Sequence, residues 1–337
     1  MTDAPFLYLA PIRGITDWLF RTLFQRHFGG VDAAVAPFLN PQPHANIDIR
    51  QLHDLLPEHN QALPVVPQFL HTDPDGLLAL AHRLHDLGYT QINWNLGCPA
   101  PMVTRKRRGS GLLPYPDAIL SFLDTVLPRL PLQLSIKTRL GLNHPDELAA
   151  LLPRLDDYPL KEIIIHTRLG KQLYRGATDP ERFGQSLALS RHPLVYNGDI
   201  TDLESWNRLH RQFPTVRRWM IGRGLLADPF LARVIRGEEF SDEQRIAMMR
   251  AFHQDLFAGC REILAGPSHL LGRMKQIWAY LAVSFPNSPK LWKKIKKAGT
   301  VERYLEAVGE VLTQVPNASP DISPPRAASA RGQIPSS

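Results

Sequence analysis

The sequence has few of the features that mark disulfide-bonded, secreted or membrane-spanning proteins. Only two cysteines, Cys98 and Cys260, occur among 337 residues, and they lie far apart. Two such thiols give little support to a disulfide and none to a metal site. No apolar run reaches the ~18 residues that a transmembrane helix needs. The N-terminal MTDAPFLYLAP has no basic region before its short apolar stretch, so we expect a cytoplasmic protein with no signal peptide and no membrane partner.

A G-x-G-x-x-G turn is also missing after the first strand-like segment, which disfavours a dinucleotide-binding Rossmann domain. Hydrophobic residues make up 44% of the chain, enough for a large core, so global disorder is excluded. The net charge of +7 favours a polyanionic partner, although many basic proteins bind no nucleic acid.

Short β-rich segments alternate with helix-like stretches over the first 225 or so residues, and most begin about 25 to 30 residues apart, the length of one βα unit. Eight strands in strict alternation with helices fit a closed α/β (β/α)₈ TIM barrel better than an open sheet. The predicted strands are Phe6–Pro11, Ala33–Phe38, Val65–Leu70, Ile92–Gly97, Leu134–Arg139, Ile163–Arg168, Leu194–Asp199 and Trp219–Arg223.

The pattern changes after the barrel, so we predict a catalytic barrel over residues 1–240 and an all-helical domain over 241–315. Ser241, followed by Asp242 and Glu243, is the expected N-cap of the first of these helices. Residues 316–337 are rich in Pro, Ser and Ala and are expected to form a disordered tail. A second helix carries apolar residues at helical spacing, which we interpret as core: Leu271, Met274, Ile277, Trp278 and Leu281.

Between Lys290 and Arg303 the helical domain has five lysines and one arginine against a single acid, Glu302. A charge run of this kind is usually a solvated helix face. If the barrel acts on RNA, the same run is a docking surface, and the candidate RNA-binding residues are Lys293, Lys294, Lys296 and Lys297.

Polar residues gather at the C-terminal ends of the predicted strands, where a barrel of this type has its active site. The alternative is that each residue only caps its own strand. The convergence of so many hydrogen-bonding groups instead predicts a polar pocket, formed by Gln68, Asn95, Cys98, Lys137, Arg139, His166, Arg168, Asn197, Asp199 and Arg223.

Two glycine-containing turns, NGD (residues 197–199) and GRG (residues 222–224), follow the seventh and eighth predicted strands. Loops at these positions commonly bind phosphate, because glycine leaves the backbone N–H groups accessible and arginine supplies charge. A phosphorylated cofactor or substrate is therefore expected, and flavin mononucleotide (FMN) fits. Lys137 would lie near the ring and stabilise the charge of a reduced flavin. His166 could instead be a satisfied core histidine.

Cys98 begins a loop between Gly97 and Pro99. Free cysteine is usually a small buried hydrophobe, but these neighbours favour an exposed loop position. A thiol with a reference pKa of about 8.5 is mostly protonated at neutral pH and can donate a proton. A thiolate nucleophile is the alternative, because the basic run at residues 105–108 follows closely.

These segments together resemble the bacterial-type, FMN-dependent tRNA-dihydrouridine synthase family. The family pattern N-x-G-C-P, followed by a basic, glycine-containing loop, is matched by INWNLGCPAPMVTRKRRGSGLL (residues 92–113). The resemblance covers the whole barrel and includes APIRGITD, SIKTRLG, IIIHTRLGKQLYRGATD, NGDI and MIGRGLLADPFL.

The resemblance implies reduction of uridines in tRNA to 5,6-dihydrouridine, with FMN as cofactor and NADPH as reductant. It places FMN against Pro11, Ile12, Arg13, Gln68, Lys137 and His166, and its phosphate against Asn197, Gly198, Asp199, Gly222 and Arg223. Cys98 would protonate C5 of uracil, while Asn95, Arg139 and Tyr174 would hold the ring. No obligate protein partner is implied, so we expect a monomer.

The sequence departs from the family pattern at Ile12, where methionine is common, and at Trp94, where an aliphatic residue is usual. The RKRRGSG loop is also more basic than the family's. Two other functions stay open at this point. One is an FMN barrel acting on a small metabolite, which leaves the basic helical domain unexplained. The other is an inactive RNA-binding homologue, which would bind RNA but purify colourless.

Overall fold

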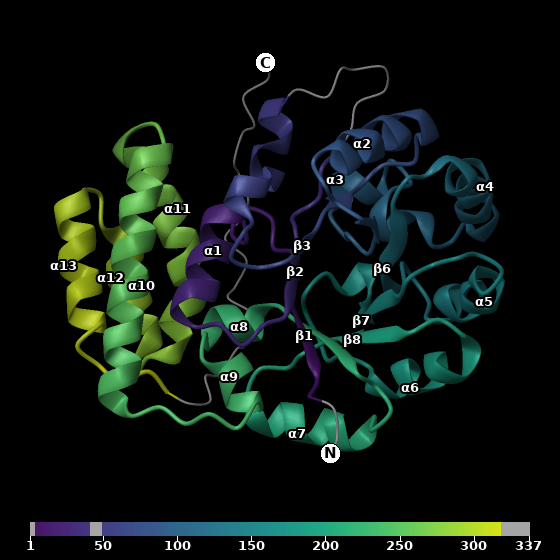
Figure 1. Ribbon diagram of the computed structural model, residues 1–337. Coiled ribbons are helices and arrows are strands. Elements are labelled where there is room, and N and C mark those ends of the chain that lie inside the picture. The colour runs from purple at the N-terminus through teal and green to yellow at the C-terminus, as the bar shows by residue number, and fades with distance from the viewer. Residues whose placement is uncertain (1–3, 41–48, 318–337) are drawn as a thin grey trace.

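A closed ring of parallel strands forms the centre of the molecule (Figure 1). The computed structural model describes residues 4–40 and 49–317. The strands follow the order β3-β2-β1-β9-β8-β7-β6-β5-β4, and every paired neighbour is parallel. Their bounds are β1 Phe6–Leu9, β2 Ala33–Val35, β3 Val65–Val66, β4 Gln68–Phe69, β5 Gln91–Leu96, β6 Gln133–Gly141, β7 Ile163–Leu169, β8 Leu194–Asn197 and β9 Arg218–Ile221. The predicted TIM barrel is confirmed.

The third predicted strand differs from the expectation, because it is split into β3 and β4 at Pro67. Proline has no N–H to donate to a neighbouring strand. Its carbonyl still accepts a bond of 2.8 Å from the Asn93 amide on β5, and Val66 accepts one of 3.0 Å from Ala36 beside β2. The two halves therefore pair with opposite neighbours, and the barrel closes through this segment.

Helices cover the outside of the ring (Figure 1). Several begin at an aspartate whose side chain accepts a backbone N–H of the first turn, as Asp17 does for α1 and Asp73 for α2. The barrel helices are α1 Trp18–His27, α2 Pro74–Asp86, α3 Pro101–Thr104, α4 Pro116–Val126, α5 Asp146–Leu155, α6 Pro180–Leu189, α7 Leu203–Gln212, α8 Arg223–Ala227 and α9 Leu231–Ile235, with 3-10 turns η1 Ile49–Leu55, η2 Pro57–His59, η3 Gly109–Leu112, η4 Leu127–Arg129 and η5 Gly170–Gln172.

Side chains alternate along the strands between two layers of packing. The outward ones join the helices in one large hydrophobic cluster, to which Leu7, Trp94 and Ile165 belong. A smaller cluster fills the barrel interior with residues such as Tyr8, Ile164 and Met220. The same alternation directs the polar residues at the strand ends inward.

The C-terminal part is helical throughout its described residues and lies beside α1 and α8 (Figure 1). It comprises α10 Asp242–Ile263, α11 Gly266–Leu281, η6 Ala282–Ser284, α12 Ser288–Lys297 and α13 Val301–Val311. Ser241 caps α10 in a capping box with Gln244, as predicted. Phe252 of α10 contacts Phe20 and Phe28, and the five apolar residues predicted as core on α11 are buried.

The core of this helical part is thus continuous with that of the barrel. The predicted domain boundary at residue 240 stays a prediction. Most of the predicted disordered tail, residues 318–337, lies outside the described residues. Among the helices that the structure describes, none is both long and apolar enough to cross a membrane.

Candidate active site

Six predicted site residues lie on five neighbouring strands, from Gln68 on β4 to Asn197 on β8. Lys137 is directly opposite Asn95 in the strand pairing, and His166 is opposite both Arg139 and Asn197. Strand alternation points these side chains into the barrel, and parallel pairing puts them at one end of it. The structure therefore brings together residues that are far apart in the sequence.

Asn95 connects the barrel interior to the Cys98 loop. Its side-chain amide donates to Gln68 Oε1 at 2.9 Å, and Gln68 donates to Asn93 Oδ1 at 2.8 Å. The Asn95 Oδ1 atom accepts the backbone N–H groups of Gly97 at 3.0 Å and Cys98 at 2.8 Å. This Asx turn fixes the direction in which the chain leaves β5. Asn95 thus positions Cys98 in addition to facing the pocket.

The Cys98 loop is also held from its far side. The Cys98 carbonyl accepts bonds from the backbone N–H and the hydroxyl of Ser110, both at 3.1 Å. Gly109 has a φ of +56°, and a Cβ there would lie 2.5 Å from the same carbonyl oxygen. Only glycine fits such a close approach. The glycine-containing segment after the basic run therefore clamps Cys98 in place.

Burial raises the pKa of the half-buried Cys98 thiol, while a backbone hydrogen bond and the cations Arg139, Arg13 and Lys137 lower it by less. The thiol is thus protonated at neutral pH, which suits a proton donor. Residues 105–108 are not among the groups with the largest effects on this pKa. The thiolate alternative, which relied on that basic run, finds no support in the structure.

Lys137 and His166 are surrounded by positive charge. Lys137 Nζ donates to Asn197 Oδ1 at 2.8 Å, and Asn197 donates to the Met220 carbonyl at 2.8 Å. Burial, with a contribution from Arg139, lowers the pKa of Lys137 to about 7. Burial and four neighbouring cations hold the pKa of His166 well below its usual value; these are Arg139, Lys137, Arg168 and Arg223.

Cations that lower one another's pKa values form a cluster whose positive charge is compensated when an anion binds. A flavin carries a phosphate and gains negative charge on its ring when it is reduced. We call this C-terminal end of the barrel the mouth. The cations and hydrogen-bond donors at the mouth therefore fit a flavin. Gly222 lets the chain after β9 pack closely against Ala10, because a Cβ there would lie 3.3 Å from the Ala10 side chain.

Asp199 supplies a carboxylate to this cationic cluster. Its side chain pairs with the buried Arg168, and its Oδ1 accepts from Arg223 Nη2 at 2.8 Å. From the sequence we predicted that the Arg223 guanidinium faces a phosphate. In the structure this guanidinium also pairs with Asp199. Arg168 also donates to the Gly176 carbonyl at 2.7 Å, so these contacts tie the loop after β7 to the loop after β8.

Arg139 and Tyr174 meet at the mouth, as expected for two residues that contact one substrate. The Arg139 guanidinium carbon lies 5.2 Å from the centre of the Tyr174 ring. Arg139 is buried and donates to the Leu169 carbonyl at 2.8 Å, whereas Tyr174 is 54% exposed. Burial lowers the pKa of Arg139 to about 10 and raises that of Tyr174. The pair offers a flat aromatic face beside a positive charge.

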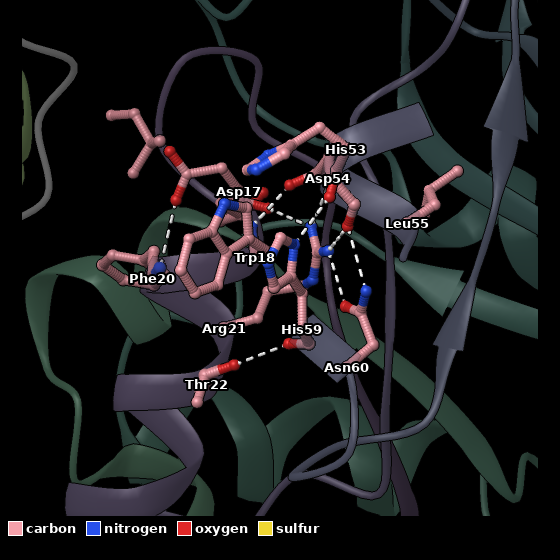
Figure 2. Close-up of polar contacts among 12 residues, drawn as sticks. Asp17, Trp18, Phe20, Arg21, Thr22, His53, Asp54, Leu55, His59 and Asn60 are labelled. Atoms are coloured by element: carbon pink, nitrogen blue, oxygen red, sulfur yellow. Dashed lines mark hydrogen bonds and ion pairs between the residues drawn. The ribbon is translucent and has the colours of Figure 1, made fainter. Parts of the chain in front are cut away.

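The loop between β1 and α1 contains Pro11, Ile12 and Arg13 and is fixed by a buried arginine that the sequence analysis missed (Figure 2). Ile12 N donates to the Thr16 hydroxyl at 2.8 Å. Arg21 Nη1 donates to the Thr16 carbonyl at 2.8 Å and pairs with Asp54 at 2.9 Å. Its Nη2 donates to the Asp54 carbonyl and the Asn60 side chain, both at 2.8 Å.

The helical part holds the same loop from the other side. Arg273 on α11 donates to the carbonyl oxygens of Gly14 and Ile15, and pairs with Asp17 at 2.7 Å. No local sequence signal marks Arg21 or Arg273, because their partners other than Thr16 lie tens or hundreds of residues away. Period-two alternation could have found Asn93, which lies two residues before Asn95 on the same face.

The four predicted RNA-binding lysines, at positions 293, 294, 296 and 297, are all exposed on α12. Lys294 pairs with Glu310 on α13, so its charge is partly balanced. Two hollows of about 530 and 540 Å³ open near Tyr89 and Thr90, at the N-terminal end of the strands, and no predicted site residue lines either.

Comparison with known proteins agrees with this geometry. The model of the dihydrouridine synthase family matches residues 8–314. The chain is 28% identical over 306 residues to the tRNA-dihydrouridine(16) synthase of Aquipseudomonas alcaligenes, covering 88% of this chain and 96% of that protein. It is 28% identical over 230 residues to tRNA-dihydrouridine synthase B of Pasteurella multocida, covering 68% of each.

Solved structures share the fold at low identity. Morphinone reductase matches with a TM-score of 0.51 at 12% identity, over 70% of this chain and 87% of that one. A 2-naphthoyl-CoA reductase matches with a TM-score of 0.52 at 10% identity, over 69% of this chain and 50% of that one. The match to the family model over nearly the whole chain is decisive: the chain belongs to the dihydrouridine synthase family.

Proposed function

We propose that this chain reduces the C5–C6 double bond of uridine in tRNA to 5,6-dihydrouridine, with bound FMN and with NADPH as the reductant. The main support is the cationic mouth around His166, which lies next to a protonated thiol on a rigid turn. FMN would lie against the loop from Pro11 to Arg13 and against Gln68, Lys137 and His166. Its phosphate would face residues 197–199 and 222–223.

When bound, the flavin supplies hydride to C6 of uracil. Hydride at C6 moves charge toward C5 and O4, so donors near O4 and a proton for C5 are needed. Cys98 holds that proton. Arg139, Tyr174 and Asn95 orient the ring, and the buried guanidinium of Arg139 opposes the developing negative charge. A stacked base cannot enter this mouth, so the uridine must flip out or lie in an open loop.

Among the relatives of this chain, several carry the name tRNA-dihydrouridine(16) synthase. We therefore propose uridine 16 as the first position to test. The cytoplasmic location and the monomeric state stay predictions.

Two measurements test the proposal. Denatured protein should release FMN, and release of FAD or of no flavin would contradict the cofactor. Dihydrouridine should then be mapped in tRNA and ribosomal RNA from cells that lack the protein and from cells that regain it. Loss and recovery of dihydrouridine in tRNA, with a Cys98→Ala variant failing to restore it, is the expected result. An unchanged map would overturn the function.

A further inference from the structure

Three exposed basic residues, Arg105, Lys106 and Arg107, form a turn directly after α3, and we call them the basic turn. From Cys98 to Pro116 the sequence has four basic residues and no acidic one. Within residues 4–40 and 49–317, no carboxylate pairs with any of the three, whereas Arg154 and Arg182 each have such a partner. The basic turn therefore carries positive charge that the folded chain leaves available to an anion.

The basic turn is rigidly attached to the candidate acid. Gly109 and Ser110, which follow it, pack against the Cys98 carbonyl, as described above. Gly111 approaches α3 so closely that a Cβ there would lie 2.5 Å from the Thr104 carbonyl oxygen. An anion bound to the basic turn would consequently lie at a fixed offset from the thiol.

Aromatic and apolar side chains accompany the charge. The Arg107 guanidinium carbon lies 4.5 Å from the centre of the Tyr115 ring. Tyr115 is 41% exposed and Met102 is 59% exposed. Arginine occupies position 107 although its φ of +50° lies in the left-handed region that favours glycine. Positive charge beside exposed aromatic surface is typical of sites that bind single-stranded nucleic acid.

The basic turn is not among the groups with the largest effects on the pKa of the Cys98 thiol. The cations with the largest effects are Arg139, Arg13 and Lys137. Arg108, the fourth basic residue of the run, faces the barrel side and contacts His71 at 2.7 Å. The three exposed cations thus point to a ligand outside the pocket.

We propose that the basic turn and Tyr115 bind the RNA strand next to the target uridine, with the cations on its phosphates and Tyr115 stacked on an unpaired base. This inference rests on the proposed function, because a uridine that leaves its stack exposes the nucleotides on either side of it. Binding at this surface would present the flipped uridine to Cys98 in a defined register.

The test compares two full-length holoenzyme variants with the same change in charge. The first is Arg105→Gln/Lys106→Gln/Arg107→Gln. The control is Arg208→Gln/Arg211→Gln/Arg217→Gln, which alters three exposed arginines on and after α7. Affinity for a labelled, unmodified tRNA transcript is measured from 50 to 200 mM NaCl. Flavin content and Tm report whether each variant is folded.

We expect the basic-turn variant to bind roughly tenfold more weakly, with a slope of log K against log salt smaller by about 2–3, as for three lost phosphate contacts. The control should stay within about twofold of the wild type. Tyr115→Leu should weaken binding several-fold without changing the slope. Equal affinities and slopes for the two triple variants would overturn the inference, as would labelled polyglutamate binding as tightly as RNA.

Dihydrouridine formation by the wild type is scored separately. Its absence would refute the proposed function, while the affinity comparison still decides whether RNA uses the basic turn.

Discussion

At the scale of single residues, the contacts and the burial of Cys98 and Lys137 bear most directly on the proposed reaction. Cys98 is held by Asn95 on one side and by Ser110 on the other, and burial keeps its thiol protonated through a raised pKa. Lys137 lies half-buried in the mouth and donates to Asn197. We therefore propose separable roles for the two residues, with Cys98 in proton donation and Lys137 in charge balance at the flavin.

Replacing Cys98 by alanine should affect only one half of the reaction. We expect Cys98→Ala to fold, bind FMN and accept hydride from NADPH at nearly the normal rate. Oxidation of the reduced flavin by unmodified tRNA should slow by about 10²- to 10⁴-fold, because the general acid is lost. Cys98→Ser should retain little activity, since a hydroxyl is a weaker acid than a thiol.

Anaerobic stopped-flow measurement of the two half-reactions checks this expectation. Cys260, which is buried in the helical part, provides a matched control as Cys260→Ala, and it should leave the ratio of the two rates unchanged. Equal slowing of both half-reactions in Cys98→Ala would remove Cys98 from the role of acid.

The lowered pKa of Lys137 predicts a dependence of stability on pH in the flavin-free protein. The folded-state pKa is about 7, and the unfolded value is about 10.4. Between these values the unfolded chain binds more protons at this site, so the free energy of unfolding rises with pH. In Lys137→Met this contribution is absent. The stability of the wild type relative to the variant should therefore increase from pH 7 to pH 10.

The increase should be about 1–3 kcal/mol, a range reduced because Lys137 keeps some contact with solvent. Urea unfolding of both flavin-free proteins at several pH values measures it. Lys171→Met, which removes an exposed lysine, controls for loss of a surface charge. A constant difference between wild type and Lys137→Met across this range would contradict a pKa of Lys137 lowered by burial and by Arg139.

At the scale of elements, the loop between β1 and α1 joins the two parts of the protein. Arg21 of α1 fixes its Thr16 end, and Arg273 of α11 holds Gly14, Ile15 and Asp17. The loop that we propose to bind FMN is therefore ordered by a contact from the helical part.

Removing the Arg273 guanidinium should weaken flavin binding. We expect Arg273→Met to raise the Kd for FMN about tenfold, because charge-assisted hydrogen bonds to the loop are each worth about 1.5–3 kcal/mol. Arg273→Lys should recover part of the affinity. The control is Arg250→Met, since Arg250 also donates to a carbonyl, that of Leu312, but far along the chain from this loop. Titration of FMN into the flavin-free proteins should separate the two; similar Kd values would show that the loop is ordered without α11.

At the scale of the whole molecule, RNA would have to contact the barrel mouth and the helical part together. Four lysines of α12 have no described ion pair, and three of them follow the i, i+3, i+4 spacing of one helix face: Lys293, Lys296 and Lys297. Their conversion to glutamine should lower the salt slope of tRNA binding by about 2–3.

The single change Lys294→Gln should have a smaller effect, because Lys294 already pairs with Glu310. Filter binding over the same salt range gives both values, with the Arg208/Arg211/Arg217 glutamine variant as the control. If the α12 triple variant keeps its affinity and slope, RNA docks elsewhere on the helical part.

Much of the site could be predicted from the sequence because the signals are local. The alternation of inward and outward side chains along a strand, and the polar residue at its end, lie within one short segment. The sequence alone therefore predicts that Asn95, Lys137 and His166 lie at the mouth. The cap at Ser241 is local for the same reason. The order of these segments and their motifs was enough to identify the fold and the family.

Only the tertiary structure decided which distant groups meet. The break at Pro67, the sharing of Arg223 by Asp199, and the clamps from Arg21 and Arg273 each depend on partners brought close by barrel closure or by packing of the helical part. The shifted pKa values of Cys98 and Lys137 follow mainly from burial in the assembled barrel, and the cations that act on Cys98 come from β6 and from the loop between β1 and α1. Sequence alone determines local conformation through steric and hydrogen-bonding preferences, whereas electrostatic environment is a sum over neighbours in space, which exist only once the chain has folded.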